Sequence, residues 1–450
     1  MPSPRRAPGP APRDLLRLLP IARDDTLAFL LELTRTWGDV TELGIPRVPV
    51  LVVNDPAAIQ HVLRDHHRNY TKRTLQYDSL ATITGRGLLT SDGEHWFRQR
   101  RLQQPAFSRA RIEGLDRIVV PAVDAMLERW APSAERGEAF DVDDEMMRLA
   151  LEIVGQALFG IDLRRDAPAL TRAVLTALDF IVHRARHPFA PPTWVPTPGN
   201  RRFGAALAAL DRAVRELVAE RRRRPPDDRD MLGLLLAARD PDDGRPMSDV
   251  ELRDEILTLL IAGHETVASA LTWTWLLLAQ HPDAWERLRA EVCATLGDRP
   301  PASADLRQLD LVRATFSEAL RLFPPAWVIS RRAIAEDELG GWRVPAGALV
   351  VISPYTMHRH AAHWSEPESF RPERFVGDAG KARHRFAYLP FGGGPRICIG
   401  NEFALVEGAL VLARVAQRFR LELEGMRPPR VEALVTLRPG GGLRVRAARA

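Results

Sequence analysis

A cysteine lies in a glycine-rich loop near the C-terminal end of the chain. Residues 391–400 read Phe-Gly-Gly-Gly-Pro-Arg-Ile-Cys-Ile-Gly, and the successive glycines and the proline permit a tight, irregular turn. A helix-forming run over residues 401–414 follows Cys398 almost at once. A cysteine at the mouth of a helix meets the positive end of the helix dipole and free backbone N–H groups. Both lower the pKa of the thiol and favour the thiolate, the form that binds metal.

Two interpretations of Cys398 are open on this segment alone. No second cysteine or histidine lies within a few residues, so the usual four-ligand zinc site is not expected. A single thiolate on a rigid loop suits haem iron with one axial protein ligand. The alternative is an ordinary glycine-rich turn that carries a small buried thiol.

A tryptophan and an arginine four residues apart form a second candidate group. Trp96 and Arg100 share one face if residues 95–100 are helical. An indole N–H and a guanidinium directed to one place can hold a carboxylate. Taken alone, the pair is more often a cation–π or packing contact at the surface.

A long helix must position the polar residues of the middle of the chain. Ser248 and Glu251 form a capping box, and the helix that they open runs to Gln280, which corresponds to roughly 50 Å at ~1.5 Å per residue. Its apolar stretch could be mistaken for a membrane span, but His264 and Glu265 near the middle favour a buried core helix.

A Glu-x-x-Arg pair precedes a proline stop. Glu318 and Arg321 lie on one helical face, and Pro324 and Pro325 end that helix. The pair is weak evidence by itself because such spacing is common on solvated helices. Its flanks are apolar, and residues 370–375 supply a further arginine, Arg374.

Together these segments resemble those of a known family. Phe391, Gly394, Arg396, Cys398 and Gly400 resemble the haem-binding signature of the cytochrome P450 family. The Trp-x-x-x-Arg pair, residues 262–266, the Glu-x-x-Arg pair and residues 370–375 match further family segments in the same order. The resemblance implies a mainly α fold with small β-sheets, the cytochrome P450 fold. It also implies a single domain over residues 1–450, with a flexible segment over 1–13, and haem b (iron-protoporphyrin IX) as the cofactor.

The resemblance also implies roles for individual residues. Cys398 is expected to be the axial metal ligand, with Phe391, Gly392 and Gly400 around its sulfur. The residues expected to hold the haem propionates are Trp96, Arg100, Arg331 and Arg396. Arg332 is the alternative to Arg331. The residues expected to act in catalysis are Ala262 and Gly263, which leave room for O2, and Glu265 and Thr266, which relay protons. Glu318, Arg321 and Arg374 are expected to form a buried charge network. Val267 departs from the family, in which a second hydroxyl residue often follows the threonine.

The expected substrate pocket is almost wholly apolar. Its lining is expected to include Leu88, Leu89, Leu259, Ala326, Trp327, Val328, Val435 and Thr436. Several of these segments resemble those of a thermophilic bacterial family member that hydroxylates the β-ring of carotenoids. We therefore expect a monooxygenase that acts on a carotenoid or terpenoid. The alternatives are a fatty-acid hydroxylase, a peroxide-driven peroxygenase and a non-enzymatic haem sensor or carrier.

Charge and cysteine usage limit the partners and the compartment. The chain has 63 Lys and Arg against 58 Asp and Glu, and the basic residues are scattered, so nucleic-acid binding is not expected. Cys293 is predicted to be a core thiol, and with two cysteines no disulfide framework is expected, which indicates the cytoplasm. Residues 1–13 contain no apolar stretch, so neither a signal peptide nor a membrane anchor is expected.

The electron supply is expected to be a separate protein. The chain ends at Ala450, which leaves no room for a fused reductase after the Cys398 loop. A separate ferredoxin and ferredoxin reductase are therefore expected to serve a monomeric enzyme. Arg98, Arg101 and Arg109 are predicted to offer positive charge to an acidic ferredoxin.

Overall fold

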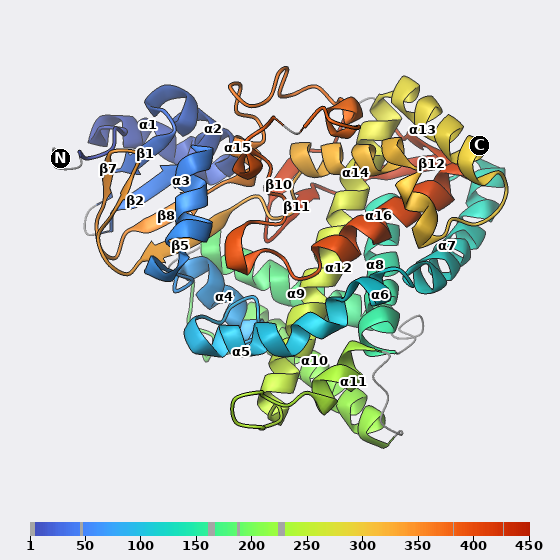
Figure 1. Cartoon of the computed structure of the whole chain (residues 1–450), viewed down its shortest axis with the longest axis horizontal. Helices are drawn as coiled ribbons and strands as arrows, with labels where there is room; N and C mark the ends of the chain where they lie inside the picture. The colour runs from blue at the N-terminus through green and yellow to red at the C-terminus, as the bar shows by residue number, and fades with distance from the viewer. Residues whose placement is uncertain are drawn as a thin grey trace.

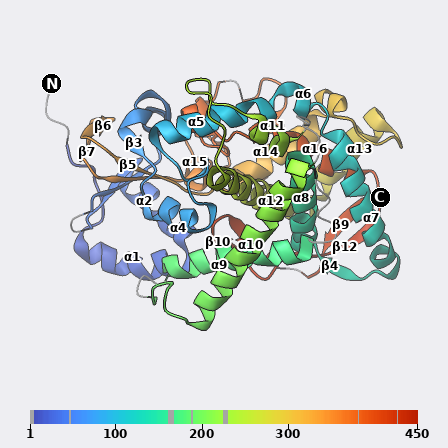
Figure 2. The ribbon, with the colours of Figure 1, turned by 90° about the horizontal axis from the view of Figure 1, so that it is seen from below.

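One helix passes through the centre of the molecule. Helix α12 (Asp249–Gln280) is seen end-on in the middle of Figure 2, with other helices around it. The predicted capping box is present: the Ser248 N–H donates to Glu251 at 2.8 Å, and the Glu251 N–H donates to the Ser248 hydroxyl at 3.2 Å. The structure is a computed structural model, and it describes residues 5–45, 48–160, 167–186, 190–223, 230–380, 382–425 and 427–450.

Helices make up most of the fold. In chain order they are α1 (Pro12–Asp24), α2 (Thr26–Trp37), α3 (Pro56–Gln60), α4 (Leu75–Thr84), α5 (Gly93–Gln103), α6 (Arg109–Ile112), α7 (Asp116–Arg136), α8 (Val142–Phe159), α9 (Ala167–Arg186), α10 (Pro198–Arg223), α11 (Met231–Ala237), α12, α13 (Pro282–Leu296), α14 (Asp310–Leu322), α15 (Pro354–Met357) and α16 (Asn401–Ala416). Two short turns also matter below, namely the π-turn η1 (His61–Asp65) and the 3-10 turn η7 (Gly394–Arg396).

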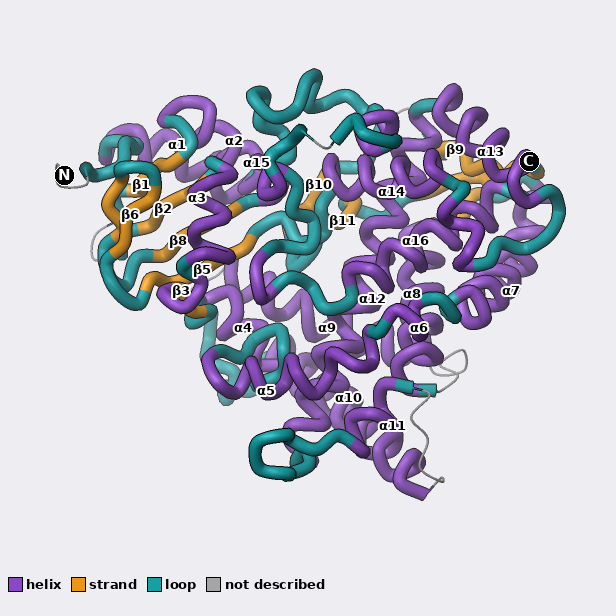
Figure 3. The backbone as a smooth tube through the Cα atoms, viewed as in Figure 1, coloured by secondary structure: helices purple, strands orange, loops and turns teal. Residues whose placement is uncertain are grey.

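The strands form small sheets at the two ends of the molecule and near its middle (Figure 3). The strands are β1 (Val40–Leu43), β2 (Val50–Val53), β3 (Tyr70–Thr71), β4 (Ala139–Asp141), β5 (Ile329–Ala333), β6 (Asp337–Leu339), β7 (Trp342–Val344), β8 (Leu349–Ile352), β9 (Phe419–Leu423), β10 (Val431–Ala433), β11 (Leu437–Pro439) and β12 (Arg444–Arg449). The largest sheet has the order β1-β2-β8-β5-β3, in which only β2 and β8 run parallel. The expected fold class, mainly α with small β-sheets, is confirmed (Figure 1).

The core packs around α12. Its C-terminal half joins an apolar cluster with α7, α8, α13, α14 and α16, and its N-terminal half joins a second cluster with α9, α10 and α11. Helix α8 approaches closely at Gly263, where an added Cβ would lie 2.9 Å from Val154. α12 is the only helix in the described ranges that is long and apolar enough to cross a membrane, and 83% of its apolar window is buried, as expected of a core helix.

The flexible segment expected over residues 1–13 stays a prediction, and its first four residues lie outside the described part of the chain. Beyond them Ala7 is buried, and the Pro8 carbonyl accepts the Glu42 N–H at 2.8 Å. One local expectation is wrong. Cys293 was expected in the core, yet its side chain is exposed, because α13 turns its Trp285 and Leu288 face inward instead.

Candidate functional site

The Cys398 loop is held by its own backbone and by glycine conformations. The Cys398 N–H donates to the Phe391 carbonyl at 3.0 Å, which closes the loop before α16 begins. Gly392 and Gly394 have φ of +71° and +69°, a region that favours glycine. At Gly394 an added Cβ would lie 1.9 Å from the Leu63 carbonyl oxygen of η1, so no larger residue fits there.

Cys398 is accessible although protein surrounds it, which indicates a hollow beside the residue. Its side chain has accessible surface, yet protein surrounds it closely enough that burial raises the pKa of the thiol. The expectation of a lowered pKa is therefore wrong for the chain alone. The Gly400 N–H and the charge of Arg100 act in the expected direction, but burial has the larger effect.

Helix α12 has a matching opening in its middle. Between residues 254 and 278 every residue is buried except Ala262, Gly263 and Thr266, which are partly exposed. Accessible surface at the centre of a buried helix marks a space beside it. The small residues identified in the sequence therefore border a hollow.

A group of cations lies near the Cys398 loop. Burial lowers the pKa of Lys72, and nearby Arg331, Arg396 and Arg100 lower it further. Among the described residues, the only ion pair made by these cations joins Arg396 to Asp92. The four cations are Lys72, Arg100, Arg331 and Arg396.

Aromatic rings and backbone carbonyls hold these cations in place. The Arg396 guanidinium lies over the Trp96 ring, 4.3 Å from its centroid. Arg331 is buried and donates to the Tyr77 hydroxyl at 3.2 Å, whereas Arg332 is directed outward to the Arg73 carbonyl. The structure therefore turns Arg331, and not Arg332, toward the interior.

This constellation fits haem. Haem carries two propionate carboxylates, and the excess of buried cations over acids around Arg396 would otherwise be electrostatically unfavourable. The indole N–H of buried Trp96 has no hydrogen-bond acceptor in the part of the chain that the structure describes. An accessible sulfur, unpaired cations and a free donor at one hollow match the donor set that an iron porphyrin needs.

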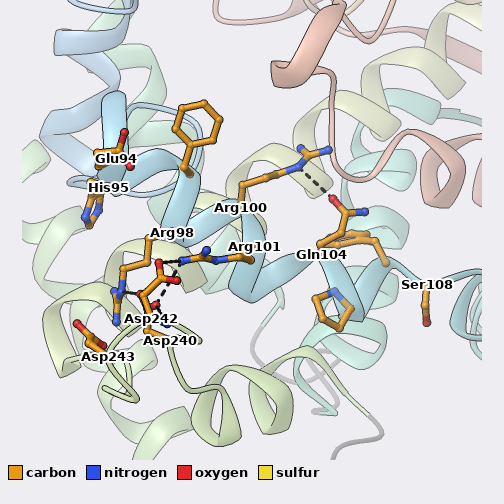
Figure 4. A pocket seen from close by; sticks show the side chains of 13 residues that line it. Glu94, His95, Arg98, Arg100, Arg101, Gln104, Ser108, Asp240, Asp242 and Asp243 are labelled. Carbon is orange, nitrogen blue, oxygen red and sulfur yellow. Dashed lines mark hydrogen bonds and ion pairs between the residues drawn. The ribbon is translucent and has the colours of Figure 1, made fainter.

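Arg100 links the cation group to the loop. Its Nη1 donates to the Ile397 carbonyl at 2.9 Å, next to Cys398, and its Nε donates to Gln104 at 3.1 Å. In Figure 4 its side chain turns away from those of Arg98 and Arg101. Arg100 can therefore steady the loop as well as hold a carboxylate.

The acid and alcohol of α12 have different partners. The Thr266 hydroxyl donates to the Ala262 carbonyl one turn back, at 2.6 Å. Glu265 is buried and accepts the Thr436 hydroxyl at 3.0 Å. Burial raises the pKa of Glu265 to about 7, although the nearby Arg438 charge and the Thr436 hydrogen bond oppose the shift.

Glu265 borders a small polar cavity of about 260 Å³. The cavity lies between α8, α9 and the β10–β11 hairpin, and its lining includes Asp143, Asp179 and Arg438. Arg438 pairs with Asp143, which also accepts the Thr272 hydroxyl at 3.1 Å, while Asp179 is exposed. The cavity thus connects a buried carboxyl to surface acids.

The three residues of the predicted charge network, Glu318, Arg321 and Arg374, lie together. Arg321 donates to Glu318 through Nε at 2.7 Å and Nη2 at 2.8 Å, and both side chains are fully buried. Arg374 approaches Glu318 at 3.3 Å. Arg321 also donates to the carbonyls of His358, Pro367 and Ser369, so it fastens the segment before Arg374 to α14.

The expected pocket residues separate into two groups. Leu259 belongs to the apolar cluster around the N-terminal half of α12, and Leu89 and Val435 pack against it. Trp327 packs with the β1–β2 side of the molecule, where its indole N–H donates to Leu434 at 2.9 Å. The remaining members are buried Leu88 and Thr436, partly exposed Val328 and exposed Ala326.

A second cavity lies outside this hollow. It measures about 950 Å³ and lies beside α5, where Figure 4 shows the side chains that line it. Arg98 pairs with Asp240 and Glu251, each at 2.6 Å, and Arg101 pairs with Asp242 at 2.7 Å.

Arg109 likewise pairs with Glu113, at 2.8 Å. The three arginines expected to offer free charge to a partner are therefore each neutralised, so that expectation is wrong. The acids that neutralise Arg98 and Arg101 come from residues 240–251, far along the chain.

Several site residues were not found from the sequence. Lys72, Tyr77 and Asp92 join the cation group, and Asp143 and Arg438 join Glu265. None belongs to a motif with fixed spacing, and only the packing of distant segments brings them together.

Comparisons with known proteins agree with the site. The chain is 40% identical over 400 residues to cyclooctatin synthase and 36% identical over 396 residues to cyclooctat-9-en-7-ol 5-monooxygenase, both of Streptomyces melanosporofaciens. Each alignment covers 88% of this chain and 85% of the relative. The crystal structure of CYP175A1 from Thermus thermophilus is 36% identical, with a TM-score of 0.81, and the match covers 98% of this chain and 100% of that one.

A family model gives the assignment over nearly the whole chain. The model described as cytochrome P450 matches residues 8–444. The relative named as a monooxygenase adds the reaction type. The chain therefore belongs to the cytochrome P450 family and is a haem-dependent monooxygenase.

Proposed function

We propose that this P450 binds haem b through Cys398 and hydroxylates a lipophilic carotenoid or terpenoid. The observation that carries the proposal is the hollow to which Cys398 has access. Partly exposed Ala262, Gly263 and Thr266 interrupt the buried α12, and unpaired cations lie beside the Cys398 loop.

Residues of this chain account for cofactor binding. Cys398 would supply the axial sulfur, and Phe391, Gly392 and Gly400 would shape the loop around it. Trp96, Arg100, Arg331 and Arg396 would hold the propionates, and the structure adds Lys72 to that group. The chemistry that haem supplies when bound is the activation of O2 with two electrons, which places one oxygen atom in a C–H bond and the other in water.

The protein's own part is to place and move protons. Ala262 carries only a methyl group and so leaves room beside α12, whereas the missing Cβ of Gly263 lets α8 approach the helix. Thr266 presents a hydroxyl there, held by the Ala262 carbonyl. Glu265, with a pKa of about 7, is present both as acid and as carboxylate at neutral pH, so it can take up and release a proton.

The polar cavity offers Glu265 a route to solvent. It is large enough for water, and it extends from Glu265 to the exposed Asp179. Protons taken up at the surface would pass Arg438 and Asp143 on the way. The Thr436 hydroxyl fixes one Glu265 oxygen at the inner end.

The apolar lining supports a lipophilic substrate. Leu89, Leu259 and Val435 pack in or against one apolar cluster, which favours burial of a hydrocarbon. The relatives named for cyclooctatin and cyclooctat-9-en-7-ol act on terpenoid-related compounds and support the same class. A fatty acid would need a partner for its carboxylate, and the expected pocket residues include no arginine.

Product analysis with a substrate panel tests this assignment. The purified protein is supplied with a ferredoxin, its reductase and 18O-labelled O2, and is offered β-carotene, a cyclic diterpene alcohol and a long-chain fatty acid. We expect a change of the haem spin state, and a product with one labelled oxygen, for a carotenoid or terpenoid. Turnover of the fatty acid alone would contradict the proposed substrate class.

The same assay separates the alternative chemistries. A peroxygenase would turn over efficiently with H2O2 and would keep that activity in Thr266→Ala. We expect the acid–alcohol pair to be needed, and we propose that electrons come from a separate ferredoxin and its reductase to a monomeric cytoplasmic enzyme. A sensor or carrier would give no product with any electron source.

A further inference from the structure

A histidine pair and an aspartate form a second polar cluster away from the haem site. His61 and His66 lie on the π-turn η1 and at its end, and Asp337 begins β6. The His61 Nε2, the His66 Nδ1 and an Asp337 oxygen all lie within 4.8 Å of one another. We propose that this cluster binds a divalent transition-metal ion of the Zn²⁺ class.

The local backbone accounts for the meeting of the two imidazoles. In a regular α-helix, side chains five residues apart point about 140° away from each other. In η1 the His66 N–H instead donates to the His61 carbonyl at 2.8 Å, five residues back, and this wider turn brings both rings to one face. The ring centroids are 4.0 Å apart, at an interplanar angle of 32°.

The distances are close to those that a metal requires. His61 Nε2 lies 2.9 Å and His66 Nδ1 lies 3.6 Å from the same Asp337 oxygen. Zinc bonds of ~2.0–2.2 Å place the ligand atoms of a tetrahedral site about 3.4 Å apart. Small side-chain rotations would therefore admit an ion. Imidazole nitrogens select Zn²⁺, Cu²⁺ or Ni²⁺ over Mg²⁺ and Ca²⁺.

A second layer of hydrogen bonds orients the carboxylate. The Tyr70 hydroxyl donates to the Asp337 Oδ2 at 2.9 Å, and the Glu338 N–H donates to its other oxygen at 2.8 Å. Such partners typically tune metal affinity. The His66 side chain is 56% exposed, so the remaining coordination position would be open to water.

The site would act on the base of the Cys398 loop. The π-turn carries Leu63, whose carbonyl oxygen occupies the place where a Cβ at Gly394 would lie. An ion that joins η1 to β6 would therefore brace the loop that presents Cys398. Ordinary hydrogen bonding of His61 to Asp337 without an ion is the competing account of the cluster.

Zinc titration of the untagged, chelator-treated holoprotein separates metal binding at this cluster from hydrogen bonding without an ion. Calorimetry should show saturable binding of one Zn²⁺ that His66→Ala weakens by about 100-fold or more and Tyr70→Phe weakens by about 10–100-fold. The matched control is His67→Ala, because His67 is the next residue but its ring bonds only the Arg64 carbonyl in the described structure. Zn²⁺ should also raise the melting temperature of the wild type and of His67→Ala, but not of His66→Ala.

Three results would overturn the proposal. The first is the absence of saturable Zn²⁺ binding. The second is equal affinity in the wild type and in His66→Ala. The third is binding that survives His66→Ala but disappears in His363→Ala, since His360 and His363 form another close pair, with ring centroids 5.0 Å apart. That result would place the metal at the second pair.

Discussion

At the scale of single residues, burial sets the chemistry of the site. Glu265 is an acid enclosed by protein, and its pKa rises to about 7 because the carboxylate is poorly solvated there. His264, its neighbour on α12, is buried as well, and burial lowers the pKa of that ring to about 3, so it stays neutral. Of the two, only Glu265 can exchange a proton near neutral pH.

Replacing Glu265 by glutamine tests the proton relay. Below pH 7 the Glu265 carboxyl is protonated and can donate, and above pH 7 it loses that proton, so turnover should fall as pH rises through about 7. Glu265→Gln should lower turnover by about 100-fold and flatten this dependence, with the haem spectrum unchanged.

The control for this variant lies on the same helix. Burial also raises the pKa of Glu255 to about 7, but Glu255 accepts the Leu88 N–H and does not line the polar cavity. In Glu255→Gln, turnover should still fall as the pH rises through about 7, so the inflection of the pH-rate profile should remain. An inflection that disappears in Glu255→Gln and persists in Glu265→Gln would contradict the assignment.

Arg438 should set the position of that inflection. Its positive charge favours ionised Glu265 and so holds the pKa of Glu265 lower than burial alone would. In Arg438→Gln the pKa of Glu265 should rise, and the fall in turnover should move to higher pH. A pH-rate profile that stays in place, or moves to lower pH, would show that Arg438 does not act on Glu265.

At the scale of elements, two glycine-dependent contacts hold the site together. The Cys398 loop rests on η1 through Gly394, and α8 rests on α12 through Gly263. The sequence motifs identified both glycines. They gave a different reason for Gly263, which was expected to make room for O2, whereas its missing Cβ faces Val154 of α8.

Gly394→Ala should abolish haem binding. The new Cβ would overlap the Leu63 carbonyl, and the loop would have to move away from η1. Gly347→Ala is the matched control, because Gly347 has a similar φ of +78° but open space around the added Cβ. The measurement is haem content per purified chain, and equal content in the two variants would refute the steric argument.

The Glu318–Arg321 pair should matter far more than surface pairs. Arg321→Met leaves a fully buried carboxylate without its main partner, which should cost about 3–5 kcal/mol of unfolding free energy. Arg343→Met breaks an exposed pair with Glu336 and should cost far less, because solvent screens the two charges. Denaturant unfolding of both variants checks the contrast, and similar costs would argue against a buried network.

At the scale of the whole molecule, local motifs were predictable and distant pairings were not. Cys398, Thr266 and the Glu318–Arg321 pair carry fixed spacings that the sequence displays directly. Lys72 and Asp92 have no such spacing, and they reach the Cys398 loop only because the 70–92 region folds back against residues 391–400.

The errors have the same origin. From the sequence, Arg98 and Arg101 were predicted to be available surface charges, because their acidic partners lie about 140 residues further along the chain. The lowered pKa expected for the Cys398 thiol followed from the helix dipole and the free backbone N–H groups, and the burial that reverses it depends on the complete fold.

The reduced CO-difference spectrum tests the central claim most directly, because it reports the axial ligand of the haem iron. The wild type and Cys293→Ala should both show the thiolate-type absorption band, since Cys293 is exposed on α13, remote from the Cys398 loop in sequence. Cys398→Ala should lose that band. A thiolate-type band that persists in Cys398→Ala, or disappears in Cys293→Ala, would contradict the account.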